Sequence, residues 1–325
     1  MAVTIEGDGM QLDIFAVLSG LTGLFLLIGV GYGAVKLRVL PASASATLSA
    51  IVLKISLPCT VFLALLRPYD PAFLGDMLAA LLLGAVVVLP TAALSLCAVR
   101  LFRVRDGRRG MWAFCATFCN NVFIAYPVVR AVFGDDGLTL AAVFGIPYTV
   151  LIYTLGGWMI HRDLSGAAAR PVEWRKLLCT GINAAAFVGM FCYLTRLSPP
   201  DVLLTPITYV GNLTTPLSMF VTGMNLTAGT WRENFQDRDA LSAAFTRLIP
   251  LPLFALALLK GAQIAFPWAN PLVFGASQIV LSMPTAAVAT ILAETYQVDR
   301  RFAAREVFLS SLFCIATIPI MAMLI

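Results

Sequence analysis

Two long apolar segments of this chain are each interrupted by polar residues and proline. In the first half, Asn120, Asn121 and Pro127 lie within a run that has the length of a membrane span. In the second half, Pro284 and Thr285 interrupt another such run. A broken helix frees backbone N–H and C=O groups that lipid cannot satisfy, so breaks occur only where protein or a wet cavity surrounds them. Breaks in both halves predict a transporter with inverted repeats and a substrate site near the middle of the membrane.

The composition of the chain predicts an all-α integral membrane protein. Of its 325 residues, 60% are hydrophobic and only 12% are charged, whereas soluble proteins carry about 25% charged residues. The first residues are acidic, with Glu6 and Asp8, rather than basic. We therefore expect the first apolar run to remain as a span and not to be a cleaved signal.

The residue inventory argues against several other classes of protein. The seven cysteines lie in or beside apolar runs, no CxxC motif occurs, and His161 is the only histidine. We expect no metal site, no disulfide framework and no cofactor. No catalytic triad or Walker loop is visible, which argues against an enzyme or an ATP-driven pump. The net charge of +5 comes from short loops between spans, so we expect no nucleic-acid partner.

A bilayer core needs about 20 apolar residues per helix. On this basis the sequence predicts ten spans, at 12–35, 45–66, 72–99, 110–133, 137–160, 176–195, 202–226, 242–265, 271–295 and 303–325. We divide the chain into a first five-helix repeat (1–161), a short cytoplasmic linker (162–175) and a second five-helix repeat (176–325).

Lysine and arginine are concentrated in the loops that follow odd-numbered spans. The positive-inside rule then places these loops in the cytoplasm and both termini on the opposite side. Because each half holds an odd number of spans, the second half is inverted relative to the first. A weak internal repeat agrees with this division, with Pro58 corresponding to Pro216 and Asn120 to Pro284.

Polar residues and prolines near the breaks are the candidate functional residues. The predicted substrate-binding residues are Asn120, Asn121, Gln278, Asn212, Pro284 and Thr285. The predicted sites of helix interruption are Cys119, Pro127, Pro58 and Pro216. An alternative role for the paired asparagines is hydrogen bonding between helices. Gly29, Gly31 and Gly33 follow no strand, so we interpret them as helix-packing residues and not as a phosphate site.

Lys54 lies within the second span, and Asp76 lies early in the third. A cation inside a span costs at least ~2.5 kcal/mol and normally has a partner or a water path. We therefore predict that Lys54 and Asp76 interact; the alternative is that Lys54 extends to the membrane interface. Arg130, Arg247 and Glu294 lie near the ends of spans, and we interpret them as interface anchors.

Four strings, LKISLPCTVF, CNNVFIAYPVVRAVFG, TTPLSMFVTGMNL and SMPTAAVATILAETYQVD, occur in order along the chain. In these strings the chain resembles the auxin efflux carrier family, including plant PIN-type carriers and bacterial malonate-carrier relatives. The resemblance implies that spans 4 and 9 unwind and cross at the midplane. It also implies a scaffold of spans 1, 2, 6 and 7, a moving transport domain of the other six spans, and an elevator mechanism for organic anions.

The resemblance assigns roles to individual residues. Asn120 matches the family's crossover asparagine in span 4, and Pro284 matches the crossover proline in span 9. Lys54 and Asp76 match the charged pair of a support site beside the crossover. Plant carriers have a proline just before the asparagine, where this chain has Cys119, so unwinding here depends on the asparagines and their neighbours. The short central loop indicates a bacterial-type member in the cytoplasmic (inner) membrane.

These patterns predict a secondary active transporter for a small organic carboxylate, either malonate-like or auxin-like. Its expected partners are the lipid bilayer and the anion, and a homodimer is one assembly such a carrier can form. One alternative is a sodium- or proton-coupled carrier of the bile-acid-transporter type, with Asp76 carrying the proton. A more distant alternative is a membrane receptor that does not transport. The sequence leaves open the substrate, the direction and the coupling ion.

Overall fold

The computed structural model describes residues 3–6, 9–12, 14–163, 181–227 and 231–325, and every structural statement below concerns these residues. Most of the predicted linker at 162–175 and the start of the sixth predicted span lie outside them. The described chain is almost entirely helical, as predicted. The one addition is an antiparallel hairpin before the first helix, in which β1 (Val3–Glu6) pairs with β2 (Gly9–Leu12).

The first part of the chain forms apolar helices of different lengths. These are α1 (Ile14–Lys36), α2 (Ala44–Ile51), a π-helical turn η1 (Val52–Ser56), α3 (Leu57–Leu65), α4 (Pro71–Val86) and α5 (Val88–Leu101). The start of α4 shows why these boundaries fall where they do. The Asp70 side chain accepts a hydrogen bond from the N–H of Ala72, and proline follows as the first helical residue, where its missing N–H costs nothing.

The second part of the chain is also helical. Its uninterrupted helices are α9 (Gly181–Thr195), α10 (Asp201–Asn212), α11 (Thr214–Asn225), α12 (Trp231–Gln236), α13 (Arg238–Leu248), α14 (Pro250–Ala265) and α17 (Arg300–Ala322). Asp237 caps α13, and Asp299 caps α17, each by accepting backbone N–H groups. Both starts are therefore fixed by side chains visible in the sequence.

Two further pairs of helices are separated by non-helical segments. The first pair is α6 (Arg109–Thr117) and α7 (Ala125–His161), and the second is α15 (Pro271–Leu281) and α16 (Ala289–Thr295). Within α7, Gly134 has φ 70° and ψ −159°, a conformation that favours glycine because it lacks a Cβ. Gly134 kinks α7 between the ranges predicted as spans 4 and 5.

Six helical stretches of the described chain are long and apolar enough to cross a membrane. They are Ser19–Lys36, Ala44–Leu65, Pro71–Leu101, Ala125–His161, Arg238–Ala265 and Arg300–Ala322, and shorter apolar helices occupy Gly181–Thr195 and Pro271–Leu281. Large apolar side chains are exposed, such as Phe15 at 86% and Ile264 at 85%. Exposed apolar surface on this scale fits a lipid environment, which confirms the prediction of an integral membrane protein.

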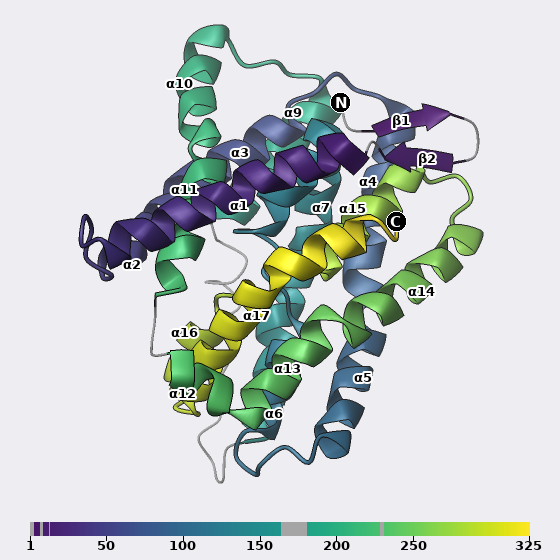
Figure 1. Ribbon diagram of the computed structural model, residues 1–325. Coiled ribbons are helices and arrows are strands. Elements are labelled where there is room, and N and C mark those ends of the chain that lie inside the picture. The colour runs from purple at the N-terminus through teal and green to yellow at the C-terminus, as the bar shows by residue number, and fades with distance from the viewer. Residues whose placement is uncertain (1–2, 7–8, 13, 164–180, 228–230) are drawn as a thin grey trace.

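The helices pack in two groups (Figure 1). In the first group, α1 lies against α11, and α3 lies against α9 and α10. In the second group, α13 packs on α17 and α6, while α7 packs on α4 and α15. The α1–α11 contact is close because a Cβ on Gly31 would overlap the carbonyl of Phe220, and one on Gly223 would overlap the carbonyl of Ile28. The predicted packing role thus holds for Gly31, whereas Gly29 and Gly33 face open space.

Candidate functional site

The two interrupted helices meet at their breaks. The N–H of Asn120 donates to the carbonyl oxygen of Pro284 at 2.7 Å, and the N–H of Ala286 donates to the carbonyl oxygen of Phe118 at 2.9 Å. Cys119 and Thr285 consequently pair as an isolated antiparallel bridge. We call residues 118–120 and 284–286 the crossover strands. Each break supplies partners for backbone groups freed by the other, so neither needs lipid to satisfy them.

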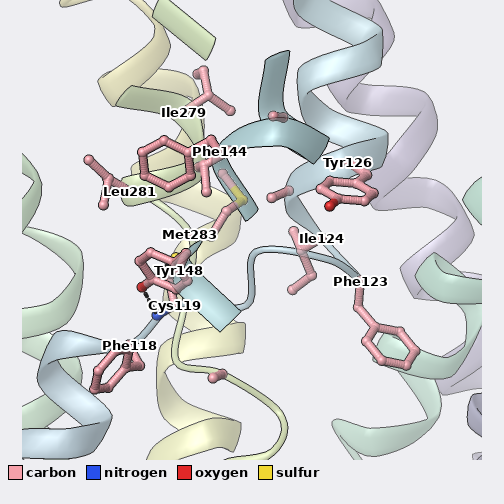
Figure 2. Packing of buried hydrophobic residues seen from close by; sticks show 14 of the residues in the cluster. Phe118, Cys119, Phe123, Ile124, Tyr126, Phe144, Tyr148, Ile279, Leu281 and Met283 are labelled. Carbon is pink, nitrogen blue, oxygen red and sulfur yellow. Dashed lines mark hydrogen bonds between the residues drawn. The ribbon is translucent and has the colours of Figure 1, made fainter. Parts of the chain in front are cut away.

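Tyr148, in the second half of α7, stabilises the first break. Its hydroxyl accepts the N–H of Cys119 at 2.8 Å and lies 3.1 Å from the Cys119 sulfur. Figure 2 shows Tyr148 beside Cys119, surrounded by apolar side chains that include Phe144 and Met283. A tyrosine later in the helix that follows the break therefore pairs the N–H of Cys119, a group that a proline at this position would lack. Sequence reasoning missed Tyr148 because the residue is distant along the chain.

Asn120 uses its side chain to shape the turn that follows the first crossover strand. The side-chain oxygen accepts the N–H of Phe123 at 3.0 Å, and the side chain is buried. This is a local side chain to backbone bond of the kind that holds non-helical turns. Asn120 is therefore engaged within the protein through both its backbone and its side chain.

Asn121 is the polar group left open at this break. It is 6% exposed, and its side-chain nitrogen has no hydrogen-bond partner in the described chain. The Tyr126 hydroxyl and this nitrogen both lie near Gly145, at 3.0 and 3.4 Å from where a Cβ on that glycine would stand. A buried donor without a partner costs about 1–3 kcal/mol. An acceptor group on a ligand or a water molecule would remove that cost.

Free backbone donors follow both crossover strands. Among the described residues, the N–H groups of Val122 and Ile124 make no hydrogen bond at the start of α7, nor do those of Ala287 and Val288 before α16. These groups lie at the positive ends of the two helix dipoles that begin at the crossover. The arrangement favours an anion over a cation at this point.

Arg247 corrects one prediction from the sequence. It is not an interface anchor, because it is 2% exposed. Its guanidinium donates to the carbonyls of Ala116 and Thr117, at 3.1 and 2.7 Å, and to that of Leu281. The carbonyl ends of α6 and α15 therefore converge on one buried cation, which satisfies acceptors that a helix end leaves free. Its position inside the predicted span 242–265 was the signal that could have identified it.

Glu306, on α17, was not selected from the sequence. Its side chain is fully buried, and Oε1 lies 2.7 Å from the hydroxyl of Thr285. That hydroxyl also lies 2.8 Å from the carbonyl oxygen of Cys115, and the N–H of Thr285 donates to the Ser310 hydroxyl. Thr285, a predicted substrate-binding residue, is thus engaged inside the protein. Like Arg247, Glu306 could have been identified from the sequence as a charged residue inside a predicted span, in this case 303–325.

Two other predicted substrate-binding residues, Gln278 and Asn212, are not part of the crossover strands. Gln278 donates to the carbonyl oxygen of Pro252 and to the Ser282 hydroxyl, which ties α15 to the start of α14. Asn212, at the end of α10, is exposed and lines a separate cavity of about 270 Å³. That cavity also contains Arg67 and Arg130, and its lining includes no crossover residue.

Lys54 and Asp76, which were predicted to interact directly or through water, form no direct ion pair among the described residues. Asp76 is buried and accepts the N–H of Asn270 at 2.8 Å, which connects α4 to the residue that caps α15. Lys54 is exposed on η1, and no ion pair joins it to Asp76 in the described ranges. Asp76 gains a backbone donor in place of a cation, and Lys54 follows the alternative in which a long side chain reaches the surface.

The predicted prolines lie in the first turn of a helix, and each follows an irregular segment: η1 before Pro58, Leu213 before Pro216 and residues 118–124 before Pro127. Pro58 is the second residue of α3, after the π-helical turn, whereas Pro216 and Pro127 are third in α11 and α7. Proline is tolerated in the first turn of a helix because its N–H would be unpaired there. The first break therefore precedes Pro127 and includes Cys119.

The start of α6 is held by a cluster of charges. Arg108 contacts Asp237 and Asp299, at 3.1 and 2.5 Å, and Arg305 also contacts Asp237 at 3.2 Å. Burial raises the pKa of Asp237, but the Arg108 charge and the hydrogen bonds from Ala240, Arg305 and Arg108 outweigh it. The pKa of Asp237 therefore lies below its usual value. The cluster connects the beginnings of α6, α13 and α17.

The chain is similar to known membrane transporters over most of its length. A family described as membrane transport protein matches residues 16–322. An uncharacterized transporter from Methanothermobacter thermautotrophicus is 26% identical over 301 residues, which cover 91% of this chain and 94% of the relative. An uncharacterized transporter from Methanocaldococcus jannaschii is 25% identical over 305 residues, covering 91% of this chain and 95% of that protein. The chain therefore belongs to the membrane transport protein family, which is the auxin efflux carrier family that its motifs resemble, and it is a membrane transporter and not an enzyme.

Proposed function

We propose that this protein is a secondary active transporter for a small organic carboxylate, which binds beside the crossover strands. The observation that carries the proposal is the unpartnered side-chain nitrogen of Asn121, buried next to the free N–H groups of Val122 and Ile124. A carboxylate accepts several hydrogen bonds at once, and bonds to a charged acceptor are stronger than those between neutral groups. The positive end of the α7 dipole favours the same charge.

The proposed architecture has ten spans in two inverted five-helix repeats, 1–161 and 176–325, with both termini on the non-cytoplasmic side. Helices α1 to α3 and α9 to α11 would form the scaffold, and the remaining helices would form the transport domain. The packing of α1 on α11 and of α3 on α9 and α10 supports the first group. The contacts of α7 with α4 and α15, and of α13 with α17, support the second.

We further propose an elevator mechanism. Both crossover strands belong to helix pairs in the second group, so a bound anion would travel with that group past the scaffold. A bacterial cytoplasmic membrane and a homodimer belong to the same proposal. The substrate would be malonate-like or auxin-like, because either offers a carboxylate to the Asn121 side chain.

The contacts of Arg247 argue against sodium as the coupling ion at the crossover. In transporters with broken helices, unwound carbonyls and the C-terminal ends of half-helices are the groups that coordinate sodium. Here the carbonyls of Thr117 and Leu281, which end α6 and α15, already accept hydrogen bonds from the Arg247 guanidinium. A cation that is part of the protein occupies that place, which disfavours the sodium-coupled alternative at the crossover.

A ligand screen on purified protein tests the proposal. We expect malonate, succinate or indole-3-acetate to raise the unfolding temperature, and we expect malonamide, which lacks the charge, to leave it unchanged. Asn121→Ala should abolish the carboxylate shift, whereas Asn212→Ala, in the separate cavity, should preserve it. A shift that survives Asn121→Ala and disappears with Asn212→Ala would place the anion in the other cavity and contradict the proposal.

A further inference from the structure

We infer that Glu306 is the proton-binding group of this transporter and that its protonation controls the crossover strands. The inference deepens the proposed function, on which it rests, by making transport a symport of the carboxylate with a proton. The side chain that carries it lies on α17, behind the second crossover strand.

Glu306 is placed where an ionised carboxylate would be costly. The side chain is fully buried, and its Oε2 has no hydrogen-bond partner in the part of the chain that the structure describes. The charged and titratable side chains that face it are Arg247, from α13, and Cys115, from α6. No ion pair within 4.0 Å joins Glu306 to Arg247 in the described chain, and that guanidinium is directed to helix-end carbonyls. A buried negative charge without an ion-pair partner is strongly disfavoured in such a place.

The two short contacts of the Thr285 hydroxyl also require a protonated Glu306. Its hydroxyl lies 2.8 Å from the carbonyl oxygen of Cys115 and 2.7 Å from Oε1 of Glu306. A threonine hydroxyl has one hydrogen to donate, and a carbonyl oxygen can only accept. If Glu306 were ionised, one of these two short contacts would join two acceptors with no hydrogen between them. If Glu306 is protonated, it donates to Thr285, which donates to Cys115, and both contacts are satisfied.

Loss of the proton changes the crossover. When the carboxyl group releases its proton to water, Thr285 has to turn its single hydrogen toward the new carboxylate. The link from Thr285 to the carbonyl of Cys115, at the end of α6, is then lost. Thr285 pairs with Cys119 across the bridge, so the neighbouring bonds of Asn120 to Pro284 and of Ala286 to Phe118 are weakened.

Binding of a proton to Glu306 and binding of the anion at the crossover strands favour each other. A carboxylate at the crossover adds negative charge near Glu306, which favours the protonated form of that residue. By reciprocity, protonated Glu306 holds the crossover strands in the arrangement that binds the anion more tightly. The direction of coupling is therefore symport of one carboxylate with a proton.

Infrared difference spectroscopy of the protein in lipid tests the proton site without any substrate. At neutral pH we expect the C=O band of a protonated buried carboxyl, which disappears at alkaline pH. The band should be absent in Glu306→Gln, whose side chain still donates to Thr285. It should be present in Asp76→Asn and in Glu294→Gln, an exposed carboxylate on α16. An unchanged band in Glu306→Gln, or its loss in Asp76→Asn alone, would overturn the inference.

Amide hydrogen exchange tests the coupling to the crossover. After correction for intrinsic rates, we expect the Asn120 and Ala286 amides to exchange roughly fivefold faster once Glu306 is ionised, equivalent to one lost hydrogen bond of about 1 kcal/mol. Glu306→Gln should show no such pH dependence. Thr285→Val should keep the infrared band and also lose the pH dependence of exchange. The same pH dependence in wild type and Glu306→Gln would overturn the inference.

Uptake of malonate into proteoliposomes tests carboxylate transport and proton symport separately. If no carboxylate is carried but the Glu306 band is present, the proposed function fails and the proton site stands. If malonate is carried, we expect an inward-directed proton gradient to raise its accumulation in wild type and Glu294→Gln but not in Glu306→Gln. Uptake indifferent to that gradient in every variant would overturn proton symport and leave carboxylate transport in place.

Discussion

The backbone N–H of Asn120 lies 2.7 Å from the carbonyl oxygen of Pro284, and this bond joins the interrupted helix of one half of the chain to that of the other. Each break therefore contributes hydrogen bonds to the other. We therefore expect changes beside this bond to affect transport, and changes to the groups that hold the helix ends to affect stability.

The two asparagines at the first break are expected to respond differently to substitution. Asn121→Ala removes a donor that has no protein partner, so its unfolding temperature should stay close to that of wild type. Transport should fall roughly 10–100-fold, as expected for a lost hydrogen bond to a charged ligand. Asn120→Ala removes the acceptor for Phe123 and should also lower the free energy of unfolding by about 1 kcal/mol. Equal transport by Asn121→Ala and wild type would contradict this assignment.

Arg247→Met is expected to destabilise the protein by about 3 kcal/mol or more, because it leaves buried carbonyls of two helix ends without donors. Arg300→Met is the matched control, since Arg300 is 66% exposed and pairs with an exposed Glu294. Its effect should stay within about 0.5 kcal/mol. Thermal unfolding in detergent measures both, and equal effects would show that Arg247 does not hold the helix ends.

Lys54 and Asp76 are expected to act independently. Asp76→Ala removes the acceptor for the Asn270 N–H and should cost about 1–3 kcal/mol, whereas Asp76→Asn keeps an acceptor oxygen and should cost less. Lys54→Met combined with Asp76→Asn should give additive changes in unfolding free energy, within about 0.5 kcal/mol. A larger coupling energy would restore the ion pair that the sequence predicted.

Acid should weaken the charge cluster at the start of α6. Because the pKa of folded Asp237 lies below its usual value, its stabilising contribution is complete above the unfolded pKa of about 3.9 and is lost as the pH falls through the folded pKa. The unfolding temperature of wild type should therefore fall more steeply below pH about 4 than that of Asp237→Asn. The exposed Asp106→Asn serves as control, and parallel curves for wild type and Asp237→Asn would refute the assignment.

The glycines of α1 provide a test of helix packing. Gly31→Ala should destabilise by about 1–3 kcal/mol, because its Cβ would meet the backbone of Phe220. Gly33→Ala introduces the same methyl group where no atom lies within 4 Å, so it should be neutral or stabilise by up to about 1 kcal/mol. Similar losses in both variants would show that α1 and α11 are not this close.

The helical, membrane-embedded character of the fold could be predicted from the sequence because the lipid environment limits it. Ten apolar ranges were predicted as spans, and six helical stretches of the described chain are long and apolar enough to cross a membrane. The family resemblance agrees with the comparisons over residues 16–322. The interruptions at Asn120 and Pro284 indicated where helices end, because polar residues and proline are costly within an apolar run. Local patterns of this kind are readable without knowledge of the tertiary contacts.

The partners of the buried polar groups could not be predicted in the same way. Asp76 was expected to contact Lys54 but accepts the N–H of Asn270, and Arg247 was expected at an interface but binds the ends of two helices. Hydrogen-bond partners depend on which helices become neighbours. Backbone N–H and C=O groups are nearly the same at every residue, so the sequence does not show which of them a buried side chain will bind. Tyr148 and Glu306 were missed for this reason, since each acts on a break that another part of the chain supplies.

Uptake of radiolabelled malonate by purified protein in proteoliposomes tests the central claim most directly, that a carboxylate is carried at the crossover strands. We expect saturable uptake by wild type, competition by other small carboxylates but not by malonamide, near-wild-type uptake by Asn212→Ala, and uptake reduced roughly 10–100-fold by Asn121→Ala. Absence of uptake and of competition for every carboxylate by well-folded protein, or full uptake by Asn121→Ala, would contradict the account.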